Sequence, residues 1–198
     1  MPKAKEVLLL LTEHWADWEA GYAIAGISFA EQYDIKTISI DKQPKASIGG
    51  IRAEIDYSIE EYQGFDNLAM IILAGSFSWG ENRYDEIADF VRKANKHGVP
   101  IAAICGATIF LAKHGFLNAV KHTGDELEYF EEMLENEDGY KGQEHFSVAQ
   151  VVNDGGFITA NETAALEFAR EIFHTLKTDT DEEINLWYEK HKNGLAEK

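Results

Sequence analysis

The sequence predicts an α/β fold with a doubly wound, mostly parallel sheet, helices on both faces and an extra C-terminal helix. Its 198 residues are enough for one domain with a sizeable core. Short runs of consecutive aliphatic residues alternate with segments in which apolar residues recur at helical spacing. Strands that are apolar throughout are buried on both faces, which is typical of a parallel sheet between two layers of helices.

Five aliphatic segments are the predicted strands: residues 7–11, 35–40, 68–73, 99–104, and the pair 147–152 with 157–160. A helix is expected after the first strand, with Asp17 as its N-cap, because apolar residues recur at helical spacing between Ala20 and Ala30. A second helix is expected over residues 84–96 and a third over residues 106–112.

Two later segments are also predicted to be helical. Residues 125–138 hold eight acidic residues and no basic one, with an apolar stripe of Leu127, Phe130 and Leu134, so a solvated acidic helix is expected. In the tail, Thr180 and Glu183 form a capping-box pattern ahead of the apolar residues Ile184, Leu186, Trp187 and Tyr188. We expect one domain over residues 1–178, with residues 179–198 as a helical extension packed on it or on a neighbouring subunit.

Composition and charge exclude several classes of partner. Eighteen basic residues against thirty-five acidic ones give a formal net charge of −17, which repels nucleic-acid phosphates and anionic lipid head groups. No apolar run approaches the roughly 20 residues that span a bilayer, and residues 7–11 are too short for a secretory signal. A single cysteine excludes an internal disulfide and a thiolate-rich metal site. A cytoplasmic protein with neither nucleic-acid nor membrane partners is expected.

The common cofactor motifs are missing from the sequence. No G-x-G-x-x-G follows the first strand, and no G-x-x-x-x-G-K-[ST] occurs, so nucleotide binding is disfavoured. The seven histidines show no H-E-x-x-H spacing, and a calcium loop near Gly139 fails because His145 and Leu134 occupy the key acidic positions. We expect no cofactor and no metal.

Cys105 is the strongest candidate for chemistry, because it follows the strand 99–104 and precedes the helix 106–112. Its neighbours Ala103, Gly106 and Ala107 are small, as a sharp strand-to-helix turn requires. Such a nucleophile elbow presents its central side chain at the carboxyl edge of the sheet. The positive end of the helix dipole is expected to lower the pKa of the thiol. The alternative is an inert core cysteine, since free cysteines are often buried.

A second loop at the same edge supports the site. The strand 68–73 is followed by Gly75 and Ser76, so the backbone N–H groups of Ser76 and Gly106 are candidates for an oxyanion hole. Gly75, Phe77 and Trp79 are the candidate substrate-binding residues, with the two rings as aromatic walls. The alternative is an ordinary glycine-containing turn.

Glu19 follows the first strand and lies at the same edge. A carboxyl group shielded by Trp15 or Trp18 is expected to have a raised pKa and to share a proton with the Cys105 thiol. The alternative is a first-turn glutamate that only favours the helix dipole.

Several motifs together resemble the PfpI/DJ-one superfamily: IILAGS at 71–76, AAICGA at 102–107, VKHT at 120–123, and the stretch from 157 to 169. The resemblance covers roughly residues 5–175. It implies the class I glutamine amidotransferase-like fold, a flavodoxin-like three-layer sandwich. It also implies that Cys105 is the reactive cysteine, Glu19 the acid that hydrogen-bonds it, His122 a histidine near it, and Ser76 and Gly106 the oxyanion-hole amides.

The sequence departs from the family pattern at three points. Protease-like members usually carry His directly after the cysteine, where this chain has Gly106. Most members have Gly-Gly where Gly75 and Ser76 stand. No histidine is followed two residues later by Glu, so a glutaminase partnered with a synthase is disfavoured.

The leading hypothesis is a cysteine-dependent hydrolase or amidase, or an enzyme of glyoxalase/deglycase-like chemistry, acting on a small-molecule or peptide carbonyl. Cys105 is then the nucleophile, Glu19 manages the thiol proton, and His122 assists acid–base transfer. One alternative is a non-catalytic redox-sensing or stress-response protein whose cysteine is oxidised. A second is a small-ligand binding module. A homodimer is expected from the resemblance and from the apolar tail.

Overall fold

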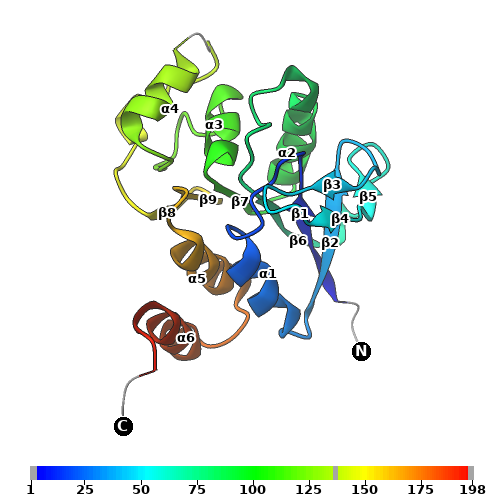
Figure 1. Ribbon diagram of the computed structural model, residues 1–198, viewed down its shortest axis with the longest axis vertical. Helices are drawn as coiled ribbons and strands as arrows, with labels where there is room; N and C mark the ends of the chain where they lie inside the picture. The colour runs from blue at the N-terminus through cyan, green and yellow to red at the C-terminus, as the bar shows by residue number, and fades with distance from the viewer. Residues whose placement is uncertain (1–3, 136–137, 196–198) are drawn as a thin grey trace.

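The computed structural model describes residues 4–135 and 138–195, which form an α/β three-layer sandwich (Figure 1). Its main sheet has seven strands in the order β5-β2-β1-β6-β7-β9-β8. Neighbouring strands pair in parallel except at one edge, where β8 runs antiparallel to β9. The predicted doubly wound, mostly parallel fold is confirmed.

The strands of the main sheet are β1 (Lys5–Leu10), β2 (Tyr33–Ser39), β5 (Tyr57–Ser58), β6 (Leu68–Leu73), β7 (Ile101–Ile104), β8 (Val151–Asp154) and β9 (Phe157–Ala160). The helices are α1 (Gly21–Ser28), α2 (Ile87–Lys96), α3 (Gly106–Lys113), α4 (Leu127–Leu134), α5 (Ala165–Leu176) and α6 (Asp181–Asn193). A small ribbon pairs β3 (Lys45–Ala46) with β4 (Arg52–Ala53), and short 3-10 turns are η1 (Phe65–Asn67), η2 (Asn82–Tyr84) and η3 (Gln143–His145). The sequence did not predict β3, β4 or β5, because two-residue strands leave no aliphatic run.

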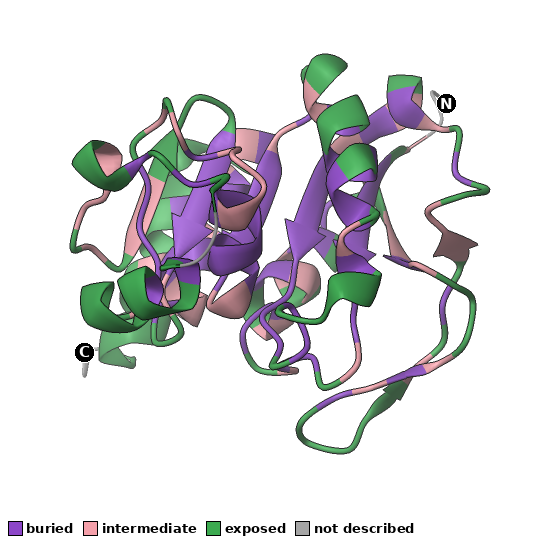
Figure 2. Cartoon of the chain, turned by 90° about the horizontal axis from the view of Figure 1, so that it is seen from above, coloured by how far each residue is buried: buried purple, intermediate pink, exposed green. Residues whose placement is uncertain are grey.

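Alternate residues of the central strands supply two separate cores. In β1, Leu8 and Leu10 pack with α2 and α3, whereas Val7 and Leu9 pack on the opposite face with α1 and α5. Successive strand side chains point to opposite faces, so a strand covered on both sides must be apolar throughout. Figure 2 shows the strands buried at the centre, with the outer faces of the helices exposed.

Two predicted boundaries are wrong. Helix α1 begins at Gly21 after Ala20, and Asp17 is not its N-cap. Instead, the Asp17 carboxylate accepts a hydrogen bond from the Gly49 N–H at 2.9 Å, which ties the loop after β1 to the β3–β4 ribbon. Residues 147–150 lie outside β8. The acidic segment forms α4 with Phe130 fully buried, and residues 136–137 of that segment lie outside the described residues.

The tail forms a capped helix that covers its own chain. The Glu183 N–H donates to the Thr180 hydroxyl at 3.3 Å, as the capping-box pattern predicts. Ile184 is 2% exposed, and Trp187 packs edge-on against Phe173 of α5 with ring centroids 4.9 Å apart. Leu186 stays 60% exposed, and the homodimer stays a prediction from the resemblance and from the apolar tail.

Among the described residues, no helix combines the length and the apolar character needed to cross a membrane.

Candidate active site

The site is built around a sharp turn between β7 and α3. Cys105 alone separates Ile104 from Gly106 and has φ 55° and ψ −133°. This φ is strained for a residue with a side chain. The Cys105 N–H donates to the Ala160 carbonyl at 3.0 Å, and the Cys105 carbonyl accepts from the Thr108 N–H at 2.8 Å. The turn is therefore fixed by the neighbouring strand β9 and by the first turn of α3.

Glycines at two positions let three segments approach closely. A Cβ at Gly75 would lie 1.9 Å from Glu19 Oε2 and 2.9 Å from the Cys105 Cβ. A Cβ at Gly106 would lie 2.8 Å from the Ser76 carbonyl oxygen. A larger residue at position 106, His included, does not fit without moving the Ser76 backbone. This explains why the chain departs from the family pattern directly after the cysteine.

Glu19 is a buried carboxyl group beside the thiol. It is 1% exposed, a hydrogen bond joins it to Cys105, and the Gly75 N–H donates to it. Its Oε2 has no hydrogen-bond partner among the described residues. Burial raises the pKa of Glu19 from 4.5 to about 7, and the nearby Asp125 charge adds to the increase. The raised pKa and the contact with Cys105 agree with the sequence-based expectation.

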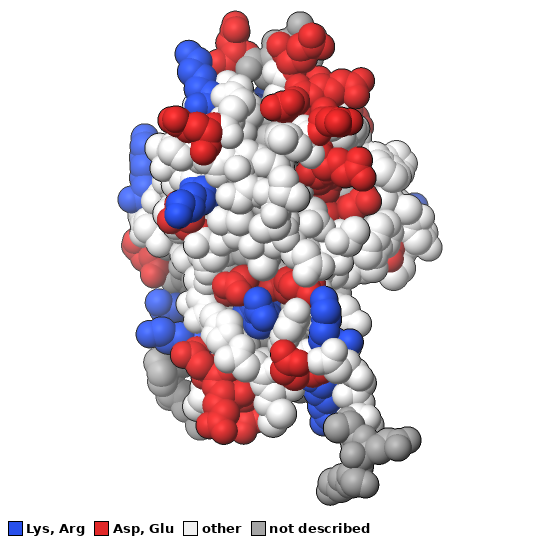
Figure 3. Space-filling model, turned by 90° about the vertical axis from the view of Figure 1, so that its left-hand side faces the viewer, with Lys and Arg blue, Asp and Glu red and all other residues white. Residues whose placement is uncertain are grey.

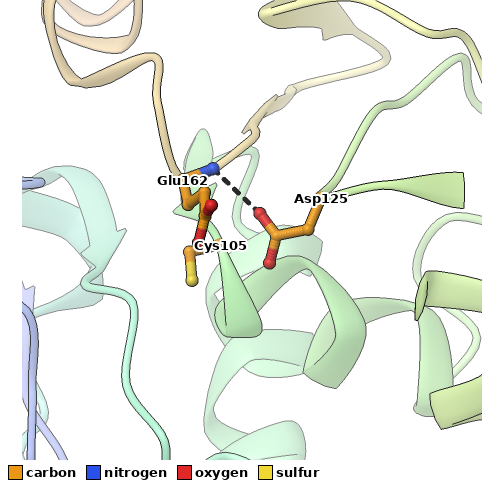
Figure 4. Close-up of side chains that lie close together, drawn as sticks. All are labelled: Cys105, Asp125 and Glu162. Atoms are coloured by element: carbon orange, nitrogen blue, oxygen red, sulfur yellow. Dashed lines mark hydrogen bonds between the residues drawn. The ribbon is translucent and has the colours of Figure 1, made fainter.

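Two further acidic residues lie on the other side of the sulfur. Cys105 Sγ and carboxylate oxygens of Asp125 and Glu162 all lie within 4.8 Å of one another (Figure 4). The Glu162 N–H donates to Asp125 Oδ1 at 2.8 Å, and burial raises the pKa of Asp125. These three side chains also offer the donor atoms of a possible metal site.

The sequence analysis missed Asp125 and Glu162. Glu162 could have been found, because it follows β9, whose carboxyl end lies beside that of β7. Asp125 had no comparable signal, since it lies in a loop between α3 and α4.

The predicted low pKa of the Cys105 thiol is wrong. Burial raises the pKa of this thiol well above its usual range, and the negative charges of Glu19 and Asp125 raise it further. The hydrogen bond from the Gly106 N–H acts in the opposite direction but is weaker. The helix terminus is thus outweighed by burial and by the charges of Glu19 and Asp125, of which only Asp125 was not placed at this site by the sequence.

The loop after β6 places its predicted site residues differently. The Ser76 hydroxyl donates to the Glu13 carbonyl at 2.6 Å and accepts from the Ser78 N–H at 2.9 Å, which fixes the loop. Phe77 is 81% exposed. Trp79 is 3% exposed, and its indole N–H donates to the Ala74 carbonyl at 2.8 Å. Trp79 therefore supports the loop from inside the core and is not an exposed aromatic wall.

His122 is fully buried and hydrogen-bonded to groups other than the thiol. Its Nδ1 lies 2.9 Å from the Val120 carbonyl oxygen and its Nε2 lies 2.8 Å from the Tyr140 hydroxyl. With Nδ1 protonated, Nε2 accepts from Tyr140, and burial lowers the pKa of the ring. Within residues 4–135 and 138–195, no histidine is hydrogen-bonded to Cys105. The structure brings Glu19, Gly75, Ser76 and Gly106 to the cysteine but gives His122 other partners.

A cavity of about 580 Å³ lies next to the cluster of Cys105, Asp125 and Glu162, and Cys105 itself is not among its lining residues. Four segments line it: the loop before α4, α4 itself, the segment before β8 and the loop after β9. The lining residues are Thr123, Gly124, Asp125, Glu126, Leu127, Tyr129, Phe146, Val148, Ala149, Asn161, Glu162 and Thr163. Asp125 and Glu162 belong both to this lining and to the cluster around Cys105.

The model of the DJ-1/PfpI family matches residues 5–175. The chain belongs to the DJ-1/PfpI family. The predicted family is confirmed, over the same span that the sequence motifs indicated.

Two similar proteins of this family are known in Bacillus subtilis by the names uncharacterized protease YoaZ and uncharacterized protease YdeA. YoaZ is 32% identical over 98% of this chain and 94% of its own length, and YdeA is 36% identical over 91% and 87%. A thiJ/pfpI family protein from Bacillus anthracis superimposes with a TM-score of 0.89 at 30% identity, covering 98% of this chain and 92% of its own. A DJ-1 superfamily protein from Agrobacterium tumefaciens gives 0.83 at 26% identity, covering 94% and 99%.

Proposed function

We propose that this chain is a cysteine-dependent hydrolase that cleaves an amide or ester carbonyl of a small molecule or peptide. One observation carries the proposal: the strained elbow holds Cys105 beside a buried carboxyl group whose pKa is about 7, and Asp125 and Glu162, which lie near the sulfur, line a cavity large enough for a substrate. A general base is most effective when its pKa lies near the working pH. The protease names of two similar proteins support the same reaction class.

In the first half-reaction, Cys105 Sγ attacks the carbonyl carbon while its proton passes to the Glu19 carboxylate. The oxyanion that forms accepts hydrogen bonds from the Gly106 and Ser76 N–H groups. Glu19, which now holds the thiol proton and whose pKa is about 7, passes that proton to the leaving group. Collapse of the tetrahedral species breaks the bond to the leaving group and leaves a thioester on Cys105.

In the second half-reaction, water attacks the thioester and gives its proton to the Glu19 carboxylate. The bond from the carbonyl carbon to Cys105 Sγ breaks, and the sulfur recovers this proton from Glu19 as the acid product leaves. Glu19 returns to its starting state. No step uses His122, whose ring nitrogens are bound to Val120 and Tyr140.

The redox-sensor alternative is disfavoured by charge. Oxidation to a sulfinate places a permanent negative charge beside Glu19, Asp125 and Glu162. A high thiol pKa also lowers the fraction of thiolate, which is the form that peroxide oxidises. A thioester carries no charge and does not meet this repulsion.

The test is acyl-enzyme formation with p-nitrophenyl acetate, followed by intact-mass measurement. We expect a burst of p-nitrophenolate and an added acetyl group on Cys105, neither of which forms in Cys105→Ala. Glu19→Gln should slow the burst, whereas His122→Gln should leave its rate close to wild type where the variant is folded. Absence of the acetyl group in wild type, together with stoichiometric sulfinate formation in peroxide, would contradict the proposal and favour the sensor.

A further inference from the structure

The cavity beside Cys105 is lined by acidic side chains without a basic counterpart. Asp125, Glu126 and Glu162 contribute carboxylates, and none of the twelve lining residues is Lys, Arg or His. Glu19 adds a fourth carboxyl group behind the sulfur, with a fully buried oxygen that has no partner among the described residues. Negative charge therefore surrounds the reactive atom from both sides.

The surface around the cavity is also negatively charged. Helix α4 carries Glu128, Glu131 and Glu132 and no basic residue. Figure 3 shows acidic side chains gathered at the end of the molecule where α4 lies. A cleft lined by one sign of charge concentrates ligands of the opposite sign.

The rest of the lining is apolar or aromatic. Leu127, Tyr129, Phe146 and Val148 face the same cavity, and its volume of about 580 Å³ lies within the range of about 300–1,000 Å³ found for small-molecule sites. An aromatic ring near carboxylates suits a cation attached to a hydrocarbon stem, because the ring face attracts the cation and the stem packs on apolar atoms.

We propose that this cavity selects an organic cation: a substrate in which an ammonium or guanidinium group is joined by a short apolar chain to the carbonyl that Cys105 attacks. This substrate class rests on the proposed hydrolase function. The cation binds between Asp125 and Glu162, and its stem lies along Tyr129 and Leu127. The bound positive charge supplies the counter-charge that the lining lacks.

A bare metal ion fits the same cluster less well. One Asp125 oxygen already accepts the Glu162 N–H at 2.8 Å, and the cavity is far larger than an ion with its ligands. The geometry therefore favours an organic cation over a divalent metal, and the experiment separates the two.

The charge preference can be measured on the thiol itself, because Cys105 is the single cysteine of the chain. The probes are two methanethiosulfonates, one with a trimethylammonium group and one with a sulfonate group. In each reaction the Cys105 proton goes to solvent, the thiolate forms a disulfide with the reagent, and methanesulfinate leaves. The ratio of the two rates, divided by the same ratio for 2-mercaptoethanol, is independent of the thiol pKa. We expect the cationic reagent to be favoured by about tenfold or more.

The variants test which carboxylates cause the preference. Asp125→Asn and Glu162→Gln should each reduce the ratio several-fold. Glu128→Gln is the matched control, since it removes the same charge from exposed α4 without touching the cavity lining, and its ratio should fall by less than that of either lining variant. A wild-type ratio near one, or an equal loss in Glu128→Gln, would overturn the proposal. Glu162 is exposed, so its variant stays informative if Asp125→Asn fails to fold.

A protection assay separates the organic cation from a metal. Butylguanidinium and butylammonium should slow alkylation of Cys105 by neutral iodoacetamide, and butyrate should not. Protection by Zn²⁺ alone, abolished by a chelator and without any effect of butylguanidinium, would identify a metal site and refute the organic cation. These measurements need no turnover. The cation preference can therefore be confirmed even if the hydrolase proposal fails, and it can be refuted even if the hydrolase proposal holds.

Discussion

On one side of the Cys105 sulfur, Glu19, Gly75 and Gly106 are packed so tightly that an added Cβ at either glycine meets another atom below 3 Å. On the other side, Asp125 and Glu162 face a cavity of about 580 Å³. We call these the elbow side and the cavity side. Both carry carboxylates, but Glu19 on the elbow side is buried, whereas Asp125 is half-buried and Glu162 is exposed.

The difference separates two tasks of one site. Close packing on the elbow side removes water from Glu19, which raises the pKa of its carboxyl group to about 7 and sets the proton chemistry. The cavity side stays partly solvated. In the proposed function, its negative charges attract cationic molecules toward the thiol and repel anionic ones. Variants on the two sides should therefore change different measurements.

The largest expected effect is on the elbow side, in Glu19→Gln. The folded-state pKa of Glu19 is raised from 4.5 to about 7, so the folded protein binds more protons than the unfolded chain between these values. The free energy of unfolding of wild type should fall by about 3 kcal/mol as pH rises from 4.5 to 7. Glu19→Gln should lose this decrease, which urea unfolding at pH 5 and pH 8 measures. Identical pH slopes in the two proteins would mean that Glu19 is hydrated.

Gly75→Ala tests the packing of the elbow side. The added Cβ would lie 1.9 Å from Glu19 Oε2, so the carboxyl group has to move. We expect a loss of about 1–3 kcal/mol in unfolding free energy, together with slower acylation. Gly80→Ala is the control, because nothing lies within 4 Å of its added Cβ. Equal stability of the two variants would contradict the close approach.

Asp125→Asn, on the cavity side, should change the pKa of the Cys105 thiol. The Asp125 charge and its hydrogen bond both raise the pKa of Cys105, so their removal should lower it. Alkylation by iodoacetamide should then begin at a lower pH, with about a tenfold gain in thiolate for each unit of the decrease. The rate of Cys105 alkylation, measured in samples quenched at successive times at several pH values, tests this expectation. An unshifted profile would leave burial and Glu19 as the only causes.

The smallest effect on stability is expected in Phe77→Ser. Phe77 is 81% exposed, so the free energy of unfolding should change by less than about 0.5 kcal/mol. Its predicted contact with substrate is tested by the acylation rate at low ester concentration. A rate equal to wild type would remove Phe77 from the substrate site.

The elbow side was largely predictable from the sequence, because its signals are local. The apolar strand ending at Ile104, the small residue Gly106 and the position of Glu19 after β1 each indicate the carboxyl edge of the sheet. The cavity side was not predictable from the sequence, since Asp125 and Glu162 lie in loops that tertiary packing brings close to Cys105. The sequence analysis also predicted the wrong sign for the pKa shift of the thiol, because the burial of Cys105 and the approach of Asp125 depend on the same packing. It could not distinguish His122, whose ring nitrogens are both hydrogen-bonded, from an acid–base residue.

The hydrogen bond from the Cys105 N–H to the Ala160 carbonyl has a consequence for biosynthesis. A ribosome releases Glu19 first and Cys105 later, and β9 and Glu162 emerge after both. Parallel pairing between β7 and β9 cannot form before then, and β9 is the strand that fixes the elbow. The nascent chain therefore carries Cys105 without the hydrogen bond that fixes its turn until β9 has been synthesised.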